Sequence, residues 1–440
     1  MGEAKEIKLT EKPDHKEFEE FVSSYFHCAK HYVEHALTDR KGGEELLELD
    51  VFTTKYSRSG EPELRLVEAK SGGWGFNACF KVSGWMNYLN VPNGCLIVSD
   101  RDSITPQKRA LVEEIGLNLI YTQNTADSEE LKNYLELSAV DENDLQGWRY
   151  AYWIRRNILE LIRHKCRSHQ NMQGFRNLKE YYYKVNSSIF FERDIISRLE
   201  NLYEIYRQHP HISAKCTQEV QTGIYDDRAR QVPQRVFEEA YQERKFNNLA
   251  LTTFVEHRAR LSILKNAIDF KIYKDLGDTN RVNEIVKILG QDFSRLNFLP
   301  DSFRTGLETI SNHEYFHLYP MFWQWFLWVF GGLILTDLKD QEYQLFSEKT
   351  GIPVSEIENA LQVYDILFPN PNGESWFRTP GNSNIKIIQM ASLPFIGNGA
   401  NYRRDIYTDT GKYEDFPVSG RYTISDLAKY NNAAYHILDR

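Results

Sequence analysis

Two short stretches near the N-terminus combine acidic residues and a lysine in a pattern suited to phosphodiester chemistry. Asp50 lies in the run LLELDVFTT, and seventeen residues separate it from Glu68, which is followed by Ala69 and Lys70. Side chains alternate between the two faces of a strand, so Glu68 and Lys70 point to one face. If the two strands pair as a hairpin, Asp50 lies beside Glu68. Two carboxylates on one face are suited to Mg²⁺ (or Mn²⁺), which polarises a scissile phosphate and activates a water, while Lys70 orients that water or offsets developing charge.

This arrangement resembles the PD-(D/E)xK restriction-endonuclease-like nuclease superfamily, and most of all its Mrr-like branch. The shared features are Asp50, the triplet Glu68-Ala69-Lys70, the pair Phe18-Glu19 on an upstream helix, and the helix and glycine-flanked apolar strand within residues 78–99. The resemblance covers about the first 125–140 residues. It implies metal ligation by Asp50 and Glu68, a catalytic Lys70 and a supporting Glu19.

The sequence departs from the superfamily pattern at two positions. Leu49 stands before the aspartate where the name of the pattern has proline, and a glycine-rich loop, SGGWG, follows Lys70. The simpler alternative for the acidic pair and the lysine is a solvated hairpin with an incidental ion pair. The helix carboxylate of Glu19, the ordered spacing and the apolar residues that precede Glu68 favour a site.

The periodicity of the first 140 residues predicts a mixed α/β domain. Apolar residues at helical spacing predict a helix over residues 14–26, and two strand-like runs and a helix follow before the buried strand at 94–99. A second helix and strand complete the predicted domain of residues 1–140, whose expected class is a restriction-endonuclease-like core. The elements expected after residue 26 are strands at 46–54 and 63–69, a helix at 78–89, a strand at 94–99, a helix at 105–115 and a strand at 117–122.

The pattern of apolar residues in the remaining chain predicts a large, mainly α-helical region. Helical periodicity predicts a domain over residues 141–368, and residues 369–440 form a loop-rich extension with a strand candidate at 385–389 and a terminal helix at 424–438. The first half of the helical domain is basic: residues 148–274 hold 23 Lys and Arg against 14 Asp and Glu, although the whole chain carries a formal charge of −9. Phosphate contacts are therefore expected in this segment.

One row of arginines in the basic segment is a candidate nucleic-acid contact. The row is spaced 7, 7 and 4 residues, which places its members on one side of a helix, opposite an apolar stripe of Tyr150, Ile154, Ile158 and Leu161. The alternative is an ordinary solvated helix face. The members of the row are Arg149, Arg156, Arg163 and Arg167.

Two histidine patterns offer competing metal chemistry. Residues 313–317, HEYFH, match the H-E-x-x-H signature of zinc metallopeptidases, in which two histidines one helical turn apart bind Zn²⁺. The alternative is a buried helix rich in aromatic and histidine side chains, and Pro320 limits that helix. His27, His31 and His35 are spaced by four and would cluster on a helix, but the chain is expected to change to strand near Tyr32.

Two further segments need an interpretation. Residues 318–336 lack any charge and reach the minimum length of a membrane span, but Pro320 and the pair Gly331-Gly332 favour a buried core helix or an oligomer interface. Residues 342–368 have the rhythm of a helix-turn-helix with Gly351 at the turn. The would-be recognition helix lacks Lys and Arg, so it is interpreted as structural or protein-binding.

The bulk properties set the expected surroundings. Five scattered cysteines without C-x-x-C spacing suit reduced thiols, and the N-terminus has no apolar signal region, so a cytoplasmic protein without membrane contact is expected. The sequence thus predicts a metal-dependent endonuclease of DNA, in bacterial restriction or anti-phage defence, with a homo-oligomer or a defence-system protein as possible partner. The alternatives are a nucleic-acid-binding scaffold with an inactive nuclease fold and a zinc metallopeptidase.

Overall fold

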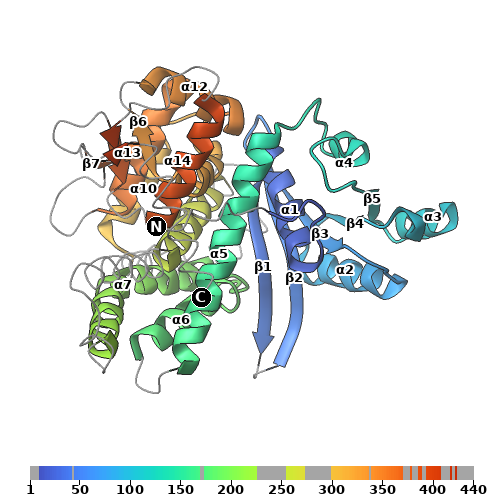
Figure 1. The fold of residues 1–440 in the computed structure, drawn as a ribbon, viewed down its shortest axis with the longest axis horizontal. Helices are drawn as coiled ribbons and strands as arrows, with labels where there is room; N and C mark the ends of the chain where they lie inside the picture. The colour runs from blue at the N-terminus through green and yellow to red at the C-terminus, as the bar shows by residue number, and fades with distance from the viewer. Residues whose placement is uncertain are drawn as a thin grey trace, which may run out of the picture. The chain divides into compact units, whose positions relative to one another are not determined.

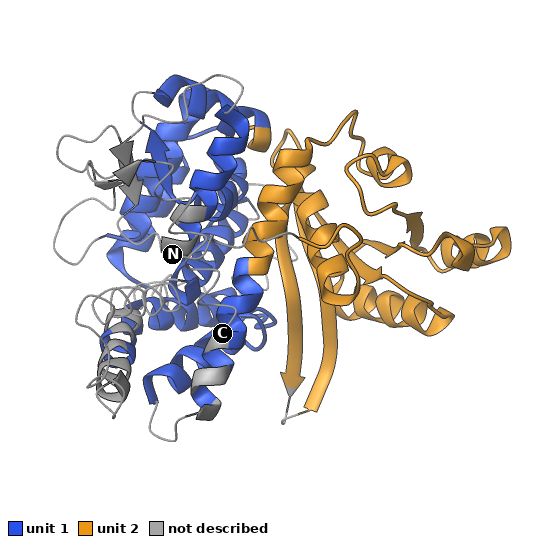
Figure 2. Ribbon diagram, viewed as in Figure 1, with its two compact units in different colours: residues 1–7, 154–348, 352–440 blue, residues 8–153, 349–351 orange. Residues whose placement is uncertain are grey.

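The computed structural model describes eleven stretches of the chain: residues 9–41, 44–168, 173–224, 254–272, 299–335, 338–369, 377–378, 385–388, 393–407, 417–418 and 422–423. They divide into two compact units, coloured separately in Figure 2. One unit holds residues 8–153 with 349–351, and the other holds the remaining described residues from 154 onwards. The division falls inside helix α5 (Glu142–Ser168), beyond the boundary after residue 140 that the sequence suggested. The described residues after 369 belong to the second unit and form no unit of their own.

The N-terminal unit is built on a five-stranded mixed sheet in the order β1-β2-β3-β4-β5 (Figure 1). The first three strands are antiparallel, and β3, β4 and β5 run parallel. The sheet confirms the predicted mixed α/β class. The edge strand β1 begins at Tyr32, where the chain was expected to change to strand, and it extends to Lys41. The strands are β1 (Tyr32–Lys41), β2 (Glu44–Tyr56), β3 (Pro62–Lys70), β4 (Asn93–Val98) and β5 (Asn118–Tyr121).

Helix α1 (His15–Cys28) covers one face of this sheet because its aromatic stripe has the helical spacing that places every ring inward. Phe18, Phe21 and Tyr25 are completely buried. Each such ring contributes roughly 1.5–3 kcal/mol through the apolar area it removes from water. The stripe packs on apolar residues of strands β2 to β5 that point to this face of the sheet: Val51, Val67, Ala69, Cys95, Ile97 and Ile120.

The parallel part of the sheet explains the helices that connect its strands. A parallel pair needs a crossover, and α2 (Phe76–Leu89) supplies it between β3 and β4, while α3 (Pro106–Glu114) supplies it between β4 and β5. Helix α2 packs on β3 and β4 through its buried residues Cys79 and Val82. The short helix α4 (Glu129–Tyr134) follows β5.

The second unit is mainly helical, as the sequence predicted. Among its described residues, a three-stranded sheet in the order β6-β8-β7 and the pair β9-β10 accompany the helices. Strand β8 confirms the candidate at 385–389, and the helix expected at 424–438 lies outside the described residues. The elements are α6 (Gln173–Val185), α7 (Ile195–Ile224), a helix over residues 254–272, α10 (Asp301–Ile310), α11 (Tyr319–Gln324), β6 (Leu333–Leu335), α12 (Lys339–Thr350), α13 (Ile357–Leu367), β7 (Phe377–Arg378), β8 (Ile385–Ile388), α14 (Leu393–Tyr407), β9 (Pro417–Val418) and β10 (Tyr422–Thr423).

The uncharged segment 318–336 forms part of the core of this unit. It contains α11, a π-helical turn over Trp325–Val329 and strand β6, and its residues 319–335 are buried. Gly331 and Gly332 take positive φ angles of 73° and 68°, which glycine adopts without the steric cost of a Cβ, and they separate the helix from the strand. The prediction of a buried core segment broken at these glycines is confirmed, and no helix in the described ranges is long and apolar enough to cross a membrane.

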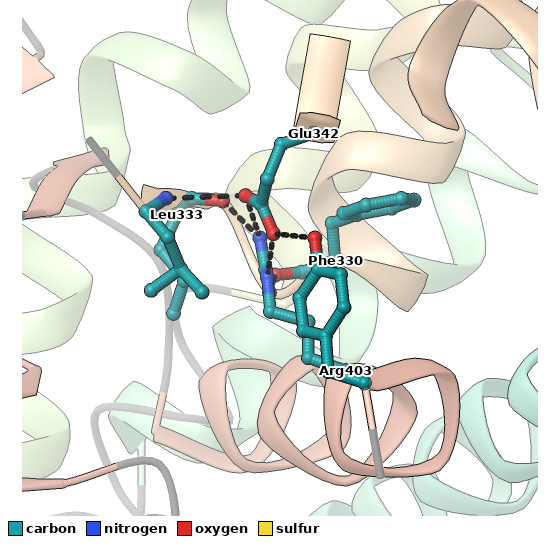
Figure 3. A network of polar contacts seen from close by, with 6 residues as sticks. Phe330, Leu333, Glu342 and Arg403 are labelled. Carbon is teal, nitrogen blue, oxygen red and sulfur yellow. Dashed lines mark hydrogen bonds and ion pairs between the residues drawn. The ribbon is translucent and has the colours of Figure 1, made fainter. Parts of the chain in front are cut away.

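Two helices, α12 and α13, confirm the helical rhythm predicted for residues 342–368. Gly351 lies between them with a φ angle of 79°, as a tight turn requires. Helix α14 was not expected from the sequence. Its Arg403 lies completely buried against Glu342 of α12 (Figure 3).

The Arg403 guanidinium joins three elements of the second unit. Its Nε lies 2.6 Å from Glu342 Oε1, its Nη1 donates to the carbonyl of Phe330 at 2.6 Å, and its Nη2 donates to the carbonyl of Leu333 (Figure 3). Glu342 Oε2 accepts from the backbone N–H of Leu335 at 3.1 Å. The buried charges are thus paired and hydrogen-bonded, and they fix β6 and the end of the π-helical turn between α12 and α14.

Candidate metal and phosphodiester site

Asp50 and Glu68 meet where strands β2 and β3 stop pairing. The last backbone pair in this direction is Val51 opposite Val67, so the next residue of each strand, Asp50 and Glu68, points to the other face. Beyond that point a side chain takes the place of the backbone hydrogen bonds between β2 and β3: Asp50 Oδ2 accepts a hydrogen bond from the Ala69 N–H at 2.9 Å. The hairpin predicted from the spacing therefore exists, and it brings the two carboxylates together.

The Asp50 carboxylate is held in an environment that disfavours its charge. The residue is 7% exposed, and burial, together with the negative charge of Glu68, raises the pKa of Asp50 to about 6. Lys70 and the Ala69 N–H act in the opposite direction without cancelling the increase in pKa. A buried pair of acids that repel each other is stabilised when a cation binds between them.

Glu68 has one oxygen engaged by lysines and one oxygen without a partner. Its Oε1 lies 2.7 Å from Lys70 Nζ and 3.7 Å from Lys81 Nζ. Its Oε2 is buried and has no hydrogen-bond partner among the described residues. A buried carboxylate oxygen left without a donor is costly, and a hard cation such as Mg²⁺ would satisfy it. This oxygen is the observation that best fits a metal ligand.

Lys70 remains cationic in this environment. Burial lowers the pKa of Lys70, but Asp50, 3.8 Å away, and the hydrogen bond to Glu68 outweigh it, so the pKa of Lys70 is raised overall. At neutral pH the side chain is therefore an ammonium group. It can donate hydrogen bonds and offset negative charge, but it cannot accept a proton.

Glu19 extends the acidic cluster from helix α1, as the Phe-Glu pair implied. Burial, together with the negative charges of Asp50 and Glu48, raises the pKa of Glu19 to about 8, although Lys70 and Lys16 act in the opposite direction. Its Oε2 lies 4.0 Å from His35 Nε2 on β1. Glu19 thus titrates close to neutral pH, where an acid–base group is most useful.

Sequence reasoning missed two members of this neighbourhood. Lys81 of α2 reaches Glu68, and His35 of β1 approaches Glu19. The only local signal for Lys81 is its place on the exposed side of a helix that crosses from β3 to β4. No pattern of residue types distinguishes such a lysine from an ordinary surface lysine, because the contact depends on how α2 packs.

The predicted arginine row lies on helix α5, but its members do not share an exposed face. Arg149 is buried, and its Nη2 donates to the Thr10 carbonyl at 2.6 Å. Arg163 donates from Nε to Tyr183 Oη at 2.9 Å and pairs with Glu160, while Arg156 is half-buried. The side chain of Arg167 lies outside the described residues. The buried Ile154 and Ile158 confirm the apolar stripe at these two of its four positions, whereas the expectation of an exposed row is wrong at Arg149.

The HEYFH segment does not form the helix that the zinc signature requires. His313 lies outside any helix or strand, Glu314 and Tyr315 form a turn, a 3₁₀ turn covers Phe316–Leu318, and α11 begins at Tyr319. Pro320 lies in the first turn of α11, a position that favours the start of a helix. The predicted helix through the two histidines is therefore wrong, and the zinc-peptidase interpretation loses its geometric basis.

The three N-terminal histidines separate as expected. Helix α1 ends at Cys28 and β1 begins at Tyr32, so the histidines do not lie on one helix face. The His27 ring stacks on Trp148 with centroids 3.4 Å apart, and His31 Nδ1 lies 3.2 Å from Thr53 Oγ1. Within the described ranges, no group of three or more His, Cys, Asp or Glu side chains is arranged to hold a metal ion.

The chain was compared with models of protein families, with curated proteins and with solved structures, and none of them matches it.

Proposed function

We propose that this protein is a metal-dependent endonuclease of the PD-(D/E)xK type, with a restriction-endonuclease-like core, and that it hydrolyses phosphodiester bonds of DNA. The buried Oε2 of Glu68, which has no hydrogen-bond partner in the described part of the chain, carries the proposal together with the buried Asp50 and the adjacent Lys70. The order of α1, three antiparallel strands, α2 and a parallel β4 supports it, because the acidic pair lies where two central strands, β2 and β3, stop pairing.

Asp50 and Glu68 would hold Mg²⁺ or Mn²⁺. Mg²⁺ commonly binds through one or two carboxylates and completes its shell with waters and substrate phosphate, so two protein ligands fit its chemistry. The bound ion would supply Lewis-acid polarisation of the phosphate and lower the pKa of a water. The Ala69 N–H holds Asp50 in place, since it donates to Oδ2 and leaves the other carboxylate oxygen for a ligand.

Lys70 and Glu19 would divide the acid–base work. Lys70 stays an ammonium group, so it stabilises negative charge that develops on the phosphate and orients the attacking water through its N–H donors. Glu19, with its pKa at about 8, is the candidate acceptor for the proton of that water. Lys81 lowers the negative potential around Glu68 and thereby favours the approach of a phosphate.

The DNA substrate and a role in restriction or anti-phage defence rest on the superfamily resemblance. The same holds for a cytoplasmic location and for a partner, whether a second copy of the chain or another defence protein. The alternative of a pure binding module conflicts with the charge of the site, because clustered carboxylates repel phosphates unless a cation neutralises them.

A cleavage assay tests the proposal. Supercoiled plasmid is incubated with pure protein and Mg²⁺ or Mn²⁺, with Lys70→Ala and Asp50→Asn as site variants and His313→Ala as the control. We expect nicking or linearisation by the wild type and by the control, and a loss of at least ~100-fold in both site variants. Cleavage that persists in both site variants would refute the site, and binding of DNA without cleavage under every metal condition would favour a binding module.

A further inference from the structure

Helix α2 presents an exposed aromatic face beside the acidic site. Phe80 is 62% exposed, the highest value among the large hydrophobic residues that are exposed in the described part of the chain, and Tyr88 is 40% exposed. The two residues lie eight positions apart, which puts them within one side of a helix and about 12 Å apart along its axis. Single exposed apolar residues are common, but exposed apolar residues that gather on one face mark a candidate interaction surface.

Gly84 leaves the space between these two rings open. It lies midway between Phe80 and Tyr88 on the exposed side of α2, and a Cβ added to it would meet no atom within 4 Å. The helix therefore has two aromatic side chains separated by bare backbone. Such a surface can accept flat groups that stack on the rings.

Positive charge accompanies the aromatic face and links it to the acidic site. Lys81 lies next to Phe80, its Nζ is 4.2 Å from the centroid of the Trp85 ring, and the same Nζ is 3.7 Å from Glu68 Oε1. Near the start of α2, Lys108 Nζ lies 4.7 Å from the centroid of the Trp74 ring. Helix α2 thus combines exposed aromatic rings with the ammonium group of Lys81, and Lys81 links this helix to the acidic site.

We infer that the exposed face of α2, formed by Phe80, Lys81, Gly84 and Tyr88, binds unpaired nucleotides of a single-stranded or locally opened nucleic acid. Bases stack on aromatic rings in a sequence-tolerant way, and lysines contact the backbone phosphates. The bases of an intact duplex are stacked on one another, so they cannot stack on Phe80 without unpairing. This inference rests on the proposed function, because it takes the phosphate beside Lys81 to be the one that the acidic site cleaves.

Binding without divalent cation tests the inference separately from cleavage. Fluorescence anisotropy would compare one labelled oligonucleotide as a single strand and as a duplex, using the wild type, Phe80→Ala and Phe80→Trp. The matched control is Leu111→Ala, which removes another exposed apolar side chain of the same unit, on α3. Because Phe80 and Leu111 are both largely exposed, neither change is expected to unfold the domain.

We expect the wild type to bind the single strand at least tenfold more tightly than the duplex, and Phe80→Ala to lose about tenfold in affinity for the single strand alone. Phe80→Trp should restore that affinity, and Leu111→Ala should leave it unchanged. Equal affinity for both forms, or equal losses in Phe80→Ala and Leu111→Ala, would overturn the inference. A change of oligomeric state in Phe80→Ala, measured by light scattering and unaccompanied by a loss of single-strand affinity, would overturn it too and would make the face a protein interface.

The same oligonucleotides with Mg²⁺ separate this inference from the proposed function. Cleavage of both forms at equal rates, abolished by Asp50→Asn and unaffected by Phe80→Ala, would leave the nuclease proposal standing and refute the α2 face. Phe80-dependent binding of the single strand without cleavage of either form would refute the nuclease and, with it, the coupling of this face to the acidic site.

Discussion

Replacing Asp50 by Asn should make the metal-free protein more stable at pH 8 while it removes the proposed metal site. The folded state raises the pKa of Asp50 from 3.8 to about 6, so the charged carboxylate is disfavoured in the fold. A change of one pKa unit corresponds to 1.36 kcal/mol, and the full increase corresponds to about 3 kcal/mol. The Asn side chain carries no charge and retains an oxygen that can accept the Ala69 N–H bond.

The expected gain is smaller than this full value because Asp50 interacts with other charges. Lys70 loses an ion-pair partner 3.8 Å away, and Glu68 loses a repelling neighbour. We therefore expect a net gain of about 1–3 kcal/mol in the free energy of unfolding at pH 8. Because the folded state binds the Asp50 proton more tightly than the unfolded state, ionisation of Asp50 lowers the free energy of unfolding of the wild type as pH rises from about 3.8 through about 6. The advantage of the variant should accordingly fall below about 1 kcal/mol at pH 4.

Hydrogen–deuterium exchange of peptides from β3 is the suitable assay, because the two units need not unfold together and exchange reports the opening of one element. The exchange of the variant is compared with that of the wild type at pH 4, and again at pH 8. Adding Mg²⁺ at pH 8 should slow exchange in the wild type and leave Asp50→Asn unchanged, since only the wild type gains free energy from binding. Equal destabilisation of the variant at both pH values would refute the reasoning, because it would show that the charge of Asp50 is not what costs stability at pH 8.

Three further substitutions, of Glu19, Lys70 and Arg403, should change cleavage or stability through the contacts of these side chains. Glu19→Gln should remove the rise in cleavage rate that we expect between pH 7 and pH 9, because the group with its pKa at about 8 is lost; a pH–rate profile unchanged in shape would exclude Glu19 as the proton acceptor. Lys70→Met should lower the cleavage rate at least ~100-fold and leave DNA affinity without metal within about tenfold, and a loss of affinity equal to the loss of rate would show that Lys70 only binds substrate. Arg403→Met should destabilise the second unit by about 3–5 kcal/mol, because Glu342 would stay buried without its charged partner. Exchange in peptides of β6 would measure the loss, with the half-buried Arg404 of the same helix replaced by Met as the control, and similar exchange in the two variants would contradict the structural role.

Much of the acidic site could be predicted from the sequence because its determinants are local. Alternation along β3 fixes that Glu68 and Lys70 share a face, and the apolar spacing of α1 fixes which side of that helix is buried and leaves Glu19 at its margin. The seventeen-residue spacing is compatible with the hairpin, whose register the structure shows from Val51 opposite Val67. The alternation of apolar and polar residues likewise identified the mixed α/β class and the long helices that follow.

Only the tertiary structure decided which of the suggestive side chains meet. Lys81 joins Glu68, whereas Arg149 leaves the expected basic row because the carbonyl of Thr10, 139 positions away, receives its guanidinium. HEYFH has the residue types of a zinc site but no helix, since Pro320 lies where α11 begins. Residue types and the periodicity of apolar residues act over a few positions, and they determine which segments form helices or strands and which face of each is buried. The meeting of charges from distant elements depends on how those faces pack, and packing is decided by the whole chain.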